Sequence, residues 1–368
     1  MASSVLFVSK PIVPPFRDGT KCLVRDISLN LREFRPIVMS TPAAPRLGES
    51  AGVELAPAYS NSGSFSPTLR QNARAALWLL VRSRADLWHF VFAPNPRTSE
   101  AARWLKRLRR VPVVQTVASP PRHFEPVEEL LFGDIVVAQS RWTRDQFRAA
   151  GAAECDYRIE VIPPPVGAVQ PRSEEAIRAQ RHEFGVPDGA PMFVYPGDLE
   201  VSSGAEVVAT AATEVLRELP DAVFVFACRA KTPAAPSLGA ALVRRLGADR
   251  SRFCSDPTDV LALMAGATGI LFPVDDLWGK VDLPISLLES MVLGAPVVVW
   301  DQGPLCDLEG AIRLVPGDSA ALVRTALELG RNPEFRGRVV ADQRRSVHDH
   351  FSASRVAEQY EQLYRELT

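Results

Sequence analysis

The residues most suited to chemistry surround the predicted start of a helix in the last third of the chain. Lys280 and Asp282 stand just before this helix, and Pro284 and Ile285 open it. Proline fits the first turn of a helix, because the N–H that it lacks would have no partner there. The amino terminus of a helix presents unpaired N–H groups and a positive dipole end, so the segment is a candidate phosphate-binding site. Glu289 lies farther along the same helix, where a lone glutamate is more often an ordinary surface residue.

Cations that could bind a phosphate stand at several predicted strand-to-helix loops. Arg229 and Lys231 follow the predicted strand at 222–228, Lys280 precedes the helix just described, and Lys21 opens the first predicted helix. Lysine at these positions is informative, because only five of the 42 basic residues are lysine. Each of these cations, taken alone, is about equally well explained as a solvated surface residue.

Two proline-containing loops that follow predicted strands supply further polar groups. The loop 93–97 contains Asn95, and the loop 119–123 contains Arg122 and His123. The pKa of histidine lies near neutrality, which suits a group that orients or deprotonates a hydroxyl. His123 is therefore a candidate catalytic residue, although a surface histidine is at least as common in such a loop.

No metal or disulfide site is expected. The five cysteines are widely scattered without a CxxC pair, which fits a reducing compartment. The acidic pair Asp275 and Asp276 is interpreted as part of a loop. His89 falls inside a predicted strand, where a packed core histidine is the more frequent case.

The elements that must position these residues alternate between apolar strands and amphipathic helices. This alternation predicts βαβ units and parallel sheets covered on both faces, an α/β fold. The segment 40–67 shows no clear period and is expected to be a loop, and 166–183 is a polar stretch. The predicted strands are 5–8, 37–39, 87–92, 111–117, 135–138, 192–195, 222–228, 269–272, 296–300 and 312–314.

Three consecutive prolines, Pro163 to Pro165, interrupt the alternation and predict a domain boundary. We therefore expect two Rossmann-like, doubly wound domains at 1–165 and 166–350, followed by a terminal helix at 351–368. Ligands of such sheets bind outside the carboxyl ends of the strands. The site is accordingly expected in a cleft onto which both domains face.

Length and composition exclude several other classes of protein. The 368 residues are 46% apolar and 23% charged, which is typical of globular proteins of about two domains. With 42 basic and 43 acidic residues, a nucleic-acid binder or a polybasic membrane anchor is not expected. No apolar run approaches the roughly 18 residues of a membrane span, and no signal peptide is recognised, so a cytoplasmic protein is expected.

The stretch 279–299 resembles the carboxyl-terminal motif of family 4 retaining glycosyltransferases, which have the GT-B fold (glycosyl transferases group 1). The resemblance implies that Glu289 hydrogen-bonds the ribose hydroxyls of a sugar nucleotide, a sound match between a carboxylate and a diol. The loop from Lys10 to Lys21 resembles the family's first loop, in which Gly19 would let backbone approach the donor diphosphate. Residues 351–364 resemble the family's terminal helix, which crosses back onto the first domain.

The chain departs from the family pattern at the expected catalytic contacts. Val281, with Asp282 beside it, stands where the family has its first glutamate. In the loop that begins at Gly197, Asp198 and Ser203 replace the family's arginine and lysine, and Ala118 replaces a histidine. A leaving diphosphate still needs positive charge. Arg229, Lys231, Lys280 and Lys21 are the candidate replacements.

The function that the resemblance implies is transfer of a sugar, with retention and without a metal or other cofactor, from a nucleoside-diphosphate sugar to an acceptor hydroxyl. A UDP-sugar is the default donor, and the acceptor and the oligomeric state are not predicted. The alternatives are a sugar-nucleotide-binding protein that has lost transfer activity, and a sugar-nucleotide 2-epimerase. The predicted catalytic residues are Asp282, His123 and Lys280; the acceptor-side residues are Asn95, Arg122 and His123; the donor-binding residues are Gly19, Lys21, Gly197, Arg229, Lys231, Lys280, Pro284, Ile285 and Glu289.

Overall fold

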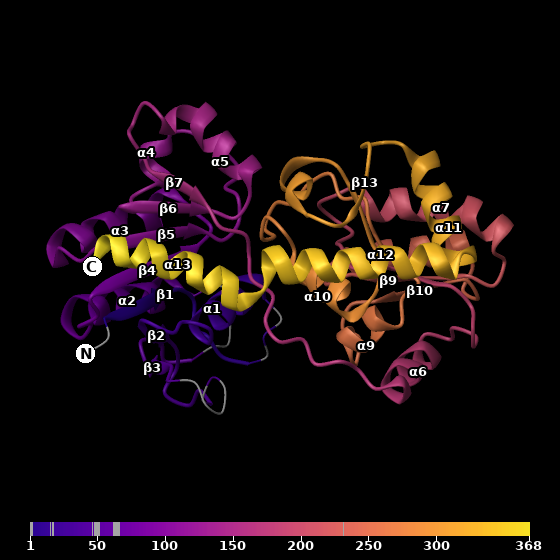
Figure 1. The fold of residues 1–368 in the computed structure, drawn as a ribbon, viewed down its shortest axis with the longest axis horizontal. Helices are drawn as coiled ribbons and strands as arrows, with labels where there is room; N and C mark the ends of the chain where they lie inside the picture. Colours follow the sequence, from indigo (N-terminus) through magenta and orange to yellow (C-terminus); the bar gives the residue numbers. More distant parts are fainter. Residues whose placement is uncertain are drawn as a thin grey trace. The chain divides into compact units, whose positions relative to one another are not determined.

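The chain forms two compact units in a computed structural model that describes residues 3–14, 16, 18–45, 47, 52–61, 67–230 and 232–368 (Figure 1). The first unit comprises Met1–Gly167, Trp278–Ile285 and His350–Thr368. The second unit comprises Ala168–Leu277 and Ser286–Asp349. Residues 278–285 therefore belong to the first unit, whereas the sequence assigned them to the carboxyl-terminal domain.

The described residues of the first unit form a seven-stranded parallel sheet in the order β3-β2-β1-β4-β5-β6-β7. Central β1 pairs with β2 on one side and β4 on the other, so the strand order reverses at β1. The strand β3 lies within the segment that the sequence predicted to be a loop, and it adds an edge beside β2. The strands are β1 (Ser4–Val8), β2 (Arg35–Met39), β3 (Glu54–Ala56), β4 (Leu87–Phe92), β5 (Val113–Val117), β6 (Ile135–Ala138) and β7 (Ile159–Val161).

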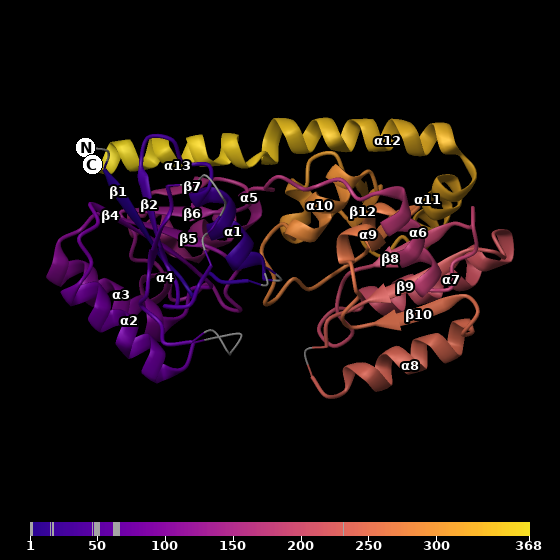
Figure 2. The same cartoon turned by 90° about the horizontal axis from the view of Figure 1, so that it is seen from below.

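Helices cover both faces of this sheet, because successive side chains of each strand point to opposite sides. Val5 and Phe7 of β1 face the core beneath α1 and α13, whereas Leu6 faces the core beneath α2 and α3. Figure 2 shows the two helix layers on either side of the strands. The helical elements are α1 (Gly19–Ser28), α2 (Leu69–Val81), α3 (Pro96–Arg109), α4 (Val127–Leu130), α5 (Arg141–Phe147), η1 (Arg148–Ala152) and α13 (Ala353–Leu367).

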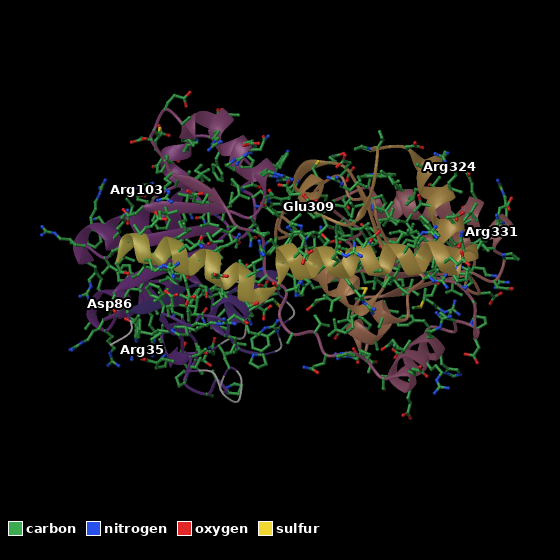
Figure 3. All side chains as sticks on the ribbon, viewed as in Figure 1. Arg35, Asp86, Arg103, Glu309, Arg324 and Arg331 are labelled. Carbon is green, nitrogen blue, oxygen red and sulfur yellow. The ribbon has the colours of Figure 1, made fainter. Side chains whose placement is uncertain are left out.

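Asp86 fixes the start of the central strands. Its side chain is labelled in Figure 3, and its carboxylate accepts hydrogen bonds from the backbone N–H and the hydroxyl of Ser4, at 2.8 and 2.7 Å. These two bonds lower the pKa of Asp86 below its ordinary value, against a small opposing effect of burial. Residues 82 positions apart are thereby joined where β1 and β4 begin.

The terminal helix α13 packs on the first unit, as the resemblance implied. Val356, Tyr360 and Leu363 are buried in the core of that unit. His89 lies beneath the helix and is fully buried. Its Nδ1 is 2.7 Å from the Tyr364 hydroxyl, and its Nε2 is 2.7 Å from Oγ1 of Thr116 in β5. His89 is therefore the core residue that its position in a strand predicted.

Burial lowers the pKa of His89 to about 3, and this makes the stability of the first unit sensitive to pH. The unfolded chain binds a proton at this histidine below pH 6.5, while the folded chain keeps the ring neutral. The contribution of neutral His89 to the free energy of unfolding is therefore complete above pH 6.5 and is lost as the pH falls. We expect a loss of about 2 kcal/mol in the free energy of unfolding at pH 5 relative to pH 7.5.

Denaturant unfolding at the two pH values, monitored for the first unit, measures this loss. His89→Gln should be less stable at pH 7.5 but should lose less on acidification. His123→Gln, which changes an exposed histidine, should keep the wild-type dependence. Equal pH dependence in His89→Gln and the wild type would contradict the prediction.

In the second unit the described residues form a six-stranded parallel sheet in the order β10-β9-β8-β11-β12-β13. The order reverses between β8 and β11, which are paired neighbours. The polar stretch at 166–183 contains α6 (Glu174–Glu183), which Ser173 caps by accepting a hydrogen bond from the N–H of Ala176. The strands are β8 (Met192–Tyr195), β9 (Val223–Ala227), β10 (Ser251–Cys254), β11 (Gly269–Phe272), β12 (Val297–Trp300) and β13 (Ile312–Leu314).

The remaining helices of the second unit connect these strands. α7 (Gly204–Glu218) follows β8, and its buried face consists mainly of alanine and valine. The others are α8 (Ala235–Leu246), α9 (Val260–Ala265), α10 (Ile285–Leu293), η2 (Gly303–Asp307), α11 (Ser319–Arg331) and α12 (Pro333–Ser346), with η3 (Val347–Phe351) leading to α13. Together the two sheets confirm the predicted α/β architecture of doubly wound, parallel sheets.

Candidate functional site

In the first unit the expected ligand-binding edge begins at the loop between β1 and α1. The Asp18 carboxylate caps α1 by accepting the N–H of Lys21 at 3.2 Å, and it pairs with Nζ of Lys10 at 2.8 Å. Nζ of Lys21 donates to the carbonyl of Val13 at 3.3 Å. Burial lowers the pKa of Lys21, with nearby Asp18 opposing the effect and Lys10 adding to it. The loop thus holds two ammonium groups beside the amino terminus of a helix.

The segment 278–285 packs against this loop through Val281. Its side chain is buried with those of Cys22 and Ile285. A Cβ atom at Gly19 would lie 2.8 Å from Cγ1 of Val281, so only glycine fits there without a shift of the valine. Gly19 therefore has a packing reason in this chain. Its contact with a diphosphate stays a prediction.

Asp282 anchors the same segment to the end of β6. Its side chain has no exposed surface, and Oδ2 accepts a hydrogen bond from Oγ of Ser140 at 2.7 Å. The same hydroxyl oxygen accepts the N–H of Thr143 and so caps α5. A fully buried carboxylate fixed in this way is suited to holding the segment in place. The predicted catalytic role of Asp282 stays a prediction, and its burial and its bond to Ser140 are what the structure adds.

Gln139, which precedes Ser140, is a residue that the sequence reasoning missed. It is 1% exposed, and neither atom of its side-chain amide has a hydrogen-bond partner among the described residues. Buried polar groups are nearly always hydrogen-bonded. The amide of Gln139 lies just beyond the carboxyl end of β6, buried and without a partner among the described residues. Its position directly after β6 was the one signal in the sequence.

The predicted acceptor-side residues lie in different environments. The guanidinium of Arg122 stacks over the indole of Trp278, 4.6 Å from the ring centroid, a cation–π contact that joins the loop after β5 to the segment 278–285. His123 is exposed beside Arg122. Asn95 caps α3 by accepting the N–H of Thr98 at 3.0 Å. Its oxygen therefore serves the helix, which the following Pro96 could have indicated.

In the second unit the equivalent edge begins at the loop after β8. Asp198 is 1% exposed, and its Oδ1 accepts the N–H groups of Val201 and Ser202 at 2.8 and 3.1 Å. Asp198 therefore stabilises the turn from within. A Cβ atom at Gly197 would lie 2.1 Å from the ring of Tyr195, so this glycine makes room for the tyrosine.

A carboxylate occupies the amino terminus of α7. The N–H and hydroxyl of Ser203 donate to the two oxygens of Asp275, at 2.9 and 2.6 Å. Partial burial raises the pKa of Asp275, but the hydrogen bonds from Ser203 outweigh it and the pKa is lowered overall. This contact joins the loops after β8 and β11, where the strand order reverses. Asp275 lies in a loop, as the sequence predicted, and its contact with Ser203 is what the structure adds.

The predicted donor-binding residues are divided between the units. Arg229 is exposed at the end of β9 and Glu289 lies half-buried on α10, both in the second unit. Lys280 belongs to the first unit, as do buried Pro284 and Ile285, where α10 begins. The remaining cation, Lys231, lies outside the described residues.

Among the residues that the structure describes, no group of three or more His, Cys, Asp or Glu side chains is arranged to hold a metal ion. None of the described helices is both long and apolar enough to cross a membrane.

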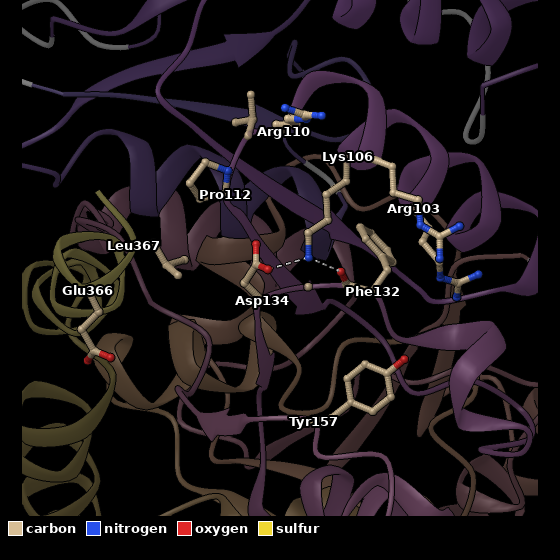
Figure 4. A pocket seen from close by; sticks show the side chains of 12 residues that line it. Arg103, Lys106, Arg110, Pro112, Phe132, Asp134, Tyr157, Glu366 and Leu367 are labelled. Atoms are coloured by element: carbon tan, nitrogen blue, oxygen red, sulfur yellow. Dashed lines mark hydrogen bonds and ion pairs between the residues drawn. The ribbon is translucent and has the colours of Figure 1, made fainter.

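A groove of about 770 Å³ lies at the opposite edge of the first sheet, beside the amino ends of β5 and β6. Figure 4 shows Lys106 in this groove, with Nζ donating to Oδ1 of Asp134 at 2.7 Å and to the carbonyl of Phe132 at 3.0 Å. Ligands of doubly wound sheets bind at the carboxyl ends. This groove is therefore separate from the candidate site.

Two doubly wound units with a terminal helix returning to the first define the GT-B class of fold. Residues 190–332, most of the second unit, match the family described as glycosyl transferases group 1. The resemblance seen in the sequence is thereby confirmed. No curated protein sequence matches the chain.

Solved structures of similar fold extend over nearly the whole chain. HepE of Anabaena, solved with UDP-glucose, has a TM-score of 0.73 and 16% identity, covering 99% of this chain and 100% of its own. Sucrose-phosphate synthase of Thermosynechococcus elongatus has a TM-score of 0.69 and 16% identity, covering 99% of both chains. WaaG, a glycosyltransferase of lipopolysaccharide biosynthesis, has a TM-score of 0.63 and 16% identity, covering 97% of this chain and 98% of its own.

Proposed function

We propose that this protein transfers a sugar from a nucleoside-diphosphate sugar to an acceptor hydroxyl. The observation that carries the proposal is the match of residues 190–332 to a glycosyltransferase family, with Glu289 on the helix that Pro284 precedes. A UDP-sugar is the first donor to test, because HepE, of the same fold, was solved with UDP-glucose. In the proposed complex Glu289 accepts hydrogen bonds from the ribose hydroxyls.

In the proposed reaction the bond between the anomeric carbon and the diphosphate oxygen breaks, and the acceptor oxygen bonds to the same face of the sugar. Because the acceptor enters on the face that the diphosphate leaves, the configuration is retained, and the departing diphosphate takes the proton of the acceptor hydroxyl. The reaction is proposed to proceed without a metal, with cationic side chains neutralising the diphosphate. Arg229, Lys231 and Lys280 are proposed to neutralise the charge that develops on the diphosphate. Lys21 and the amino terminus of α10 are proposed to assist them.

The acceptor is proposed to bind at the first unit. The exposed imidazole of His123 supplies a group that can orient a hydroxyl. Arg122 and Trp278 support the loop that carries His123. Asp282 is proposed to act through the position of the segment 278–285, which it holds by its bond to Ser140.

The test is incubation with UDP-glucose and, in parallel, with GDP-, dTDP- and ADP-sugars. We expect one donor to raise the melting temperature by mass action and to release its nucleoside diphosphate faster when acceptor extract is added. Retention is checked by the anomeric configuration of the product. Absence of both stabilisation and release for all donors would reject the proposal.

The second candidate function is binding of a sugar nucleotide without transfer. Two observations favour it: Val281 takes the place of the family's first glutamate, and the Asp275 carboxylate occupies the amino terminus of α7. Donor binding without release of diphosphate in any acceptor extract would support this candidate. Conversion of the donor to its 2-epimer would instead support the epimerase alternative.

A further inference from the structure

The segment 69–110 is strongly basic, although the net charge of the whole chain is close to zero. Residues 69–110 contain ten basic and two acidic side chains, a net charge of +8, in a chain whose net charge is −1. This segment forms α2, β4 and α3, and β4 is buried. The charge therefore lies on the two helices and the turns beside them. The balanced whole-chain sum, which argued against a polybasic surface, does not apply to this part of the molecule.

The same two helices expose unusually many apolar side chains. Of the nine large apolar residues that are exposed in the described part of the chain, five lie on α2 and α3. Leu77 with Val81, and Trp104 with Leu108, are spaced four residues apart, so each pair lies on one face of its helix. The exposed fractions are 85% for Leu69, 61% for Leu77, 70% for Val81, 60% for Trp104 and 54% for Leu108.

These helices form one continuous surface. Both pack on the same core, through Ala75 and Leu79 of α2 and through Ala102 and Leu105 of α3, and Figures 1 and 2 show them side by side. The guanidinium of Arg109 donates to the carbonyls of Leu80 and Ser83, at 3.1 and 2.7 Å, and so ties the two helices together. We call the exposed residues of 69–84 and 96–110 the α2–α3 surface.

Apart from Arg109, seven arginines of the α2–α3 surface are not used to hold the fold. Their side chains are exposed and make no hydrogen bond or ion pair within the ranges that the structure describes. Lys106 at the edge of this surface contrasts with them, because it pairs with Asp134. The residues concerned are Arg70, Arg74, Arg82, Arg84, Arg97, Arg107 and Arg110.

We propose that the α2–α3 surface binds the surface of a membrane that contains anionic lipids. Unpaired arginines attract lipid phosphates, and each basic residue near an anionic bilayer contributes to binding. Exposed leucine, valine and tryptophan beside the arginines would enter the boundary between headgroups and acyl chains. A nucleic acid would engage the arginines but would give the aliphatic side chains of Leu77, Val81 and Leu108 no counterpart. The combination of both features selects a lipid surface.

The first test is sedimentation of the full chain with vesicles of phosphatidylcholine containing about one third phosphatidylglycerol. We expect binding to these vesicles, none to pure phosphatidylcholine, and a decrease at high salt. The triple variant Arg74→Glu, Arg107→Glu, Arg110→Glu should bind at least tenfold more weakly. The matched control reverses the charge at three exposed arginines of the second unit: Arg178→Glu, Arg217→Glu and Arg338→Glu. This control should bind the vesicles as the wild type does.

The second test keeps every charge and removes the apolar contact. Trp104→Ala with Leu108→Ala should also weaken vesicle binding at least tenfold, while the melting temperature confirms that both units are folded. The emission of the wild type should shift to shorter wavelength on binding, and Trp104→Phe should lose most of this shift.

Failure to bind the anionic vesicles would overturn the proposal, as would an equal loss in the matched control. Unchanged binding by the apolar variant would also overturn it, because charge alone would then explain the result. Binding of an RNA oligonucleotide, lost in the triple Arg→Glu variant and unaccompanied by vesicle binding, would assign the surface to a nucleic acid instead.

Discussion

Glu289→Ala is expected to weaken binding of the donor sugar nucleotide at least tenfold. The substitution removes the hydrogen bonds that the carboxylate is proposed to accept from the ribose hydroxyls, and such charge-assisted bonds contribute about 1.5–3 kcal/mol. Alanine favours the helical state more than glutamate does, so α10 should persist. Calorimetric titration with the donor that stabilises the wild type measures the affinity, and thermal unfolding without donor checks the fold.

Two further variants make the Glu289 result specific. Glu289→Gln keeps one acceptor oxygen and should lose less affinity than Glu289→Ala. Glu334→Ala removes an exposed glutamate from α12 of the same unit and should bind donor normally. If Glu289→Ala bound donor as tightly as the wild type, the residue would be an ordinary surface glutamate and the donor site would have to be sought elsewhere.

Lys280→Ala combined with Arg229→Ala is expected to raise the donor dissociation constant at least a hundredfold and nearly to abolish transfer. Each cation is proposed to contact the diphosphate, at about 1.5–3 kcal/mol per contact, and the charge on the diphosphate grows during bond breaking. The single variants should each lose roughly tenfold. Donor titration and release of nucleoside diphosphate measure the two effects.

Arg178→Ala with Arg217→Ala removes the same amount of charge from exposed positions of the second unit and serves as the control. It should leave both donor affinity and turnover unchanged. Similar losses in the control and in the Lys280 and Arg229 variant would show a general effect of net charge. In that case the proposed diphosphate contacts would be wrong, whatever the outcome for Glu289.

Much of the fold follows from the sequence alone. The hydrophobic pattern of a strand or a helix lies within its own segment of sequence. Both parallel sheets and the helix after Pro284 were therefore predicted from the alternation of apolar strands and amphipathic helices. The burial of Val356, Tyr360 and Leu363 follows from their spacing on one helix face. Short strands at a sheet edge, such as β3, were not predicted, because three residues are too few to show a hydrophobic pattern.

The details of the site depend on contacts that no local pattern encodes. Ser140 meets Asp282 across 142 positions, Ser203 meets Asp275 across 72, and Val281 fills the space beside Gly19. The residues next to each of these side chains in the sequence do not indicate which distant residue it will contact. Only the packing of strands and loops decides which carboxylate is buried and which helix terminus it reaches.

The charge distribution also depends partly on the sequence and partly on the tertiary structure. The sequence determined the count of basic and acidic residues, and a balanced sum gave no reason to expect a basic surface. The tertiary structure places α2 and α3 side by side and buries β4 beneath them, so that ten basic residues come to lie around one pair of helices. Electrostatic attraction depends on the distance between charges, and that distance is set by the fold.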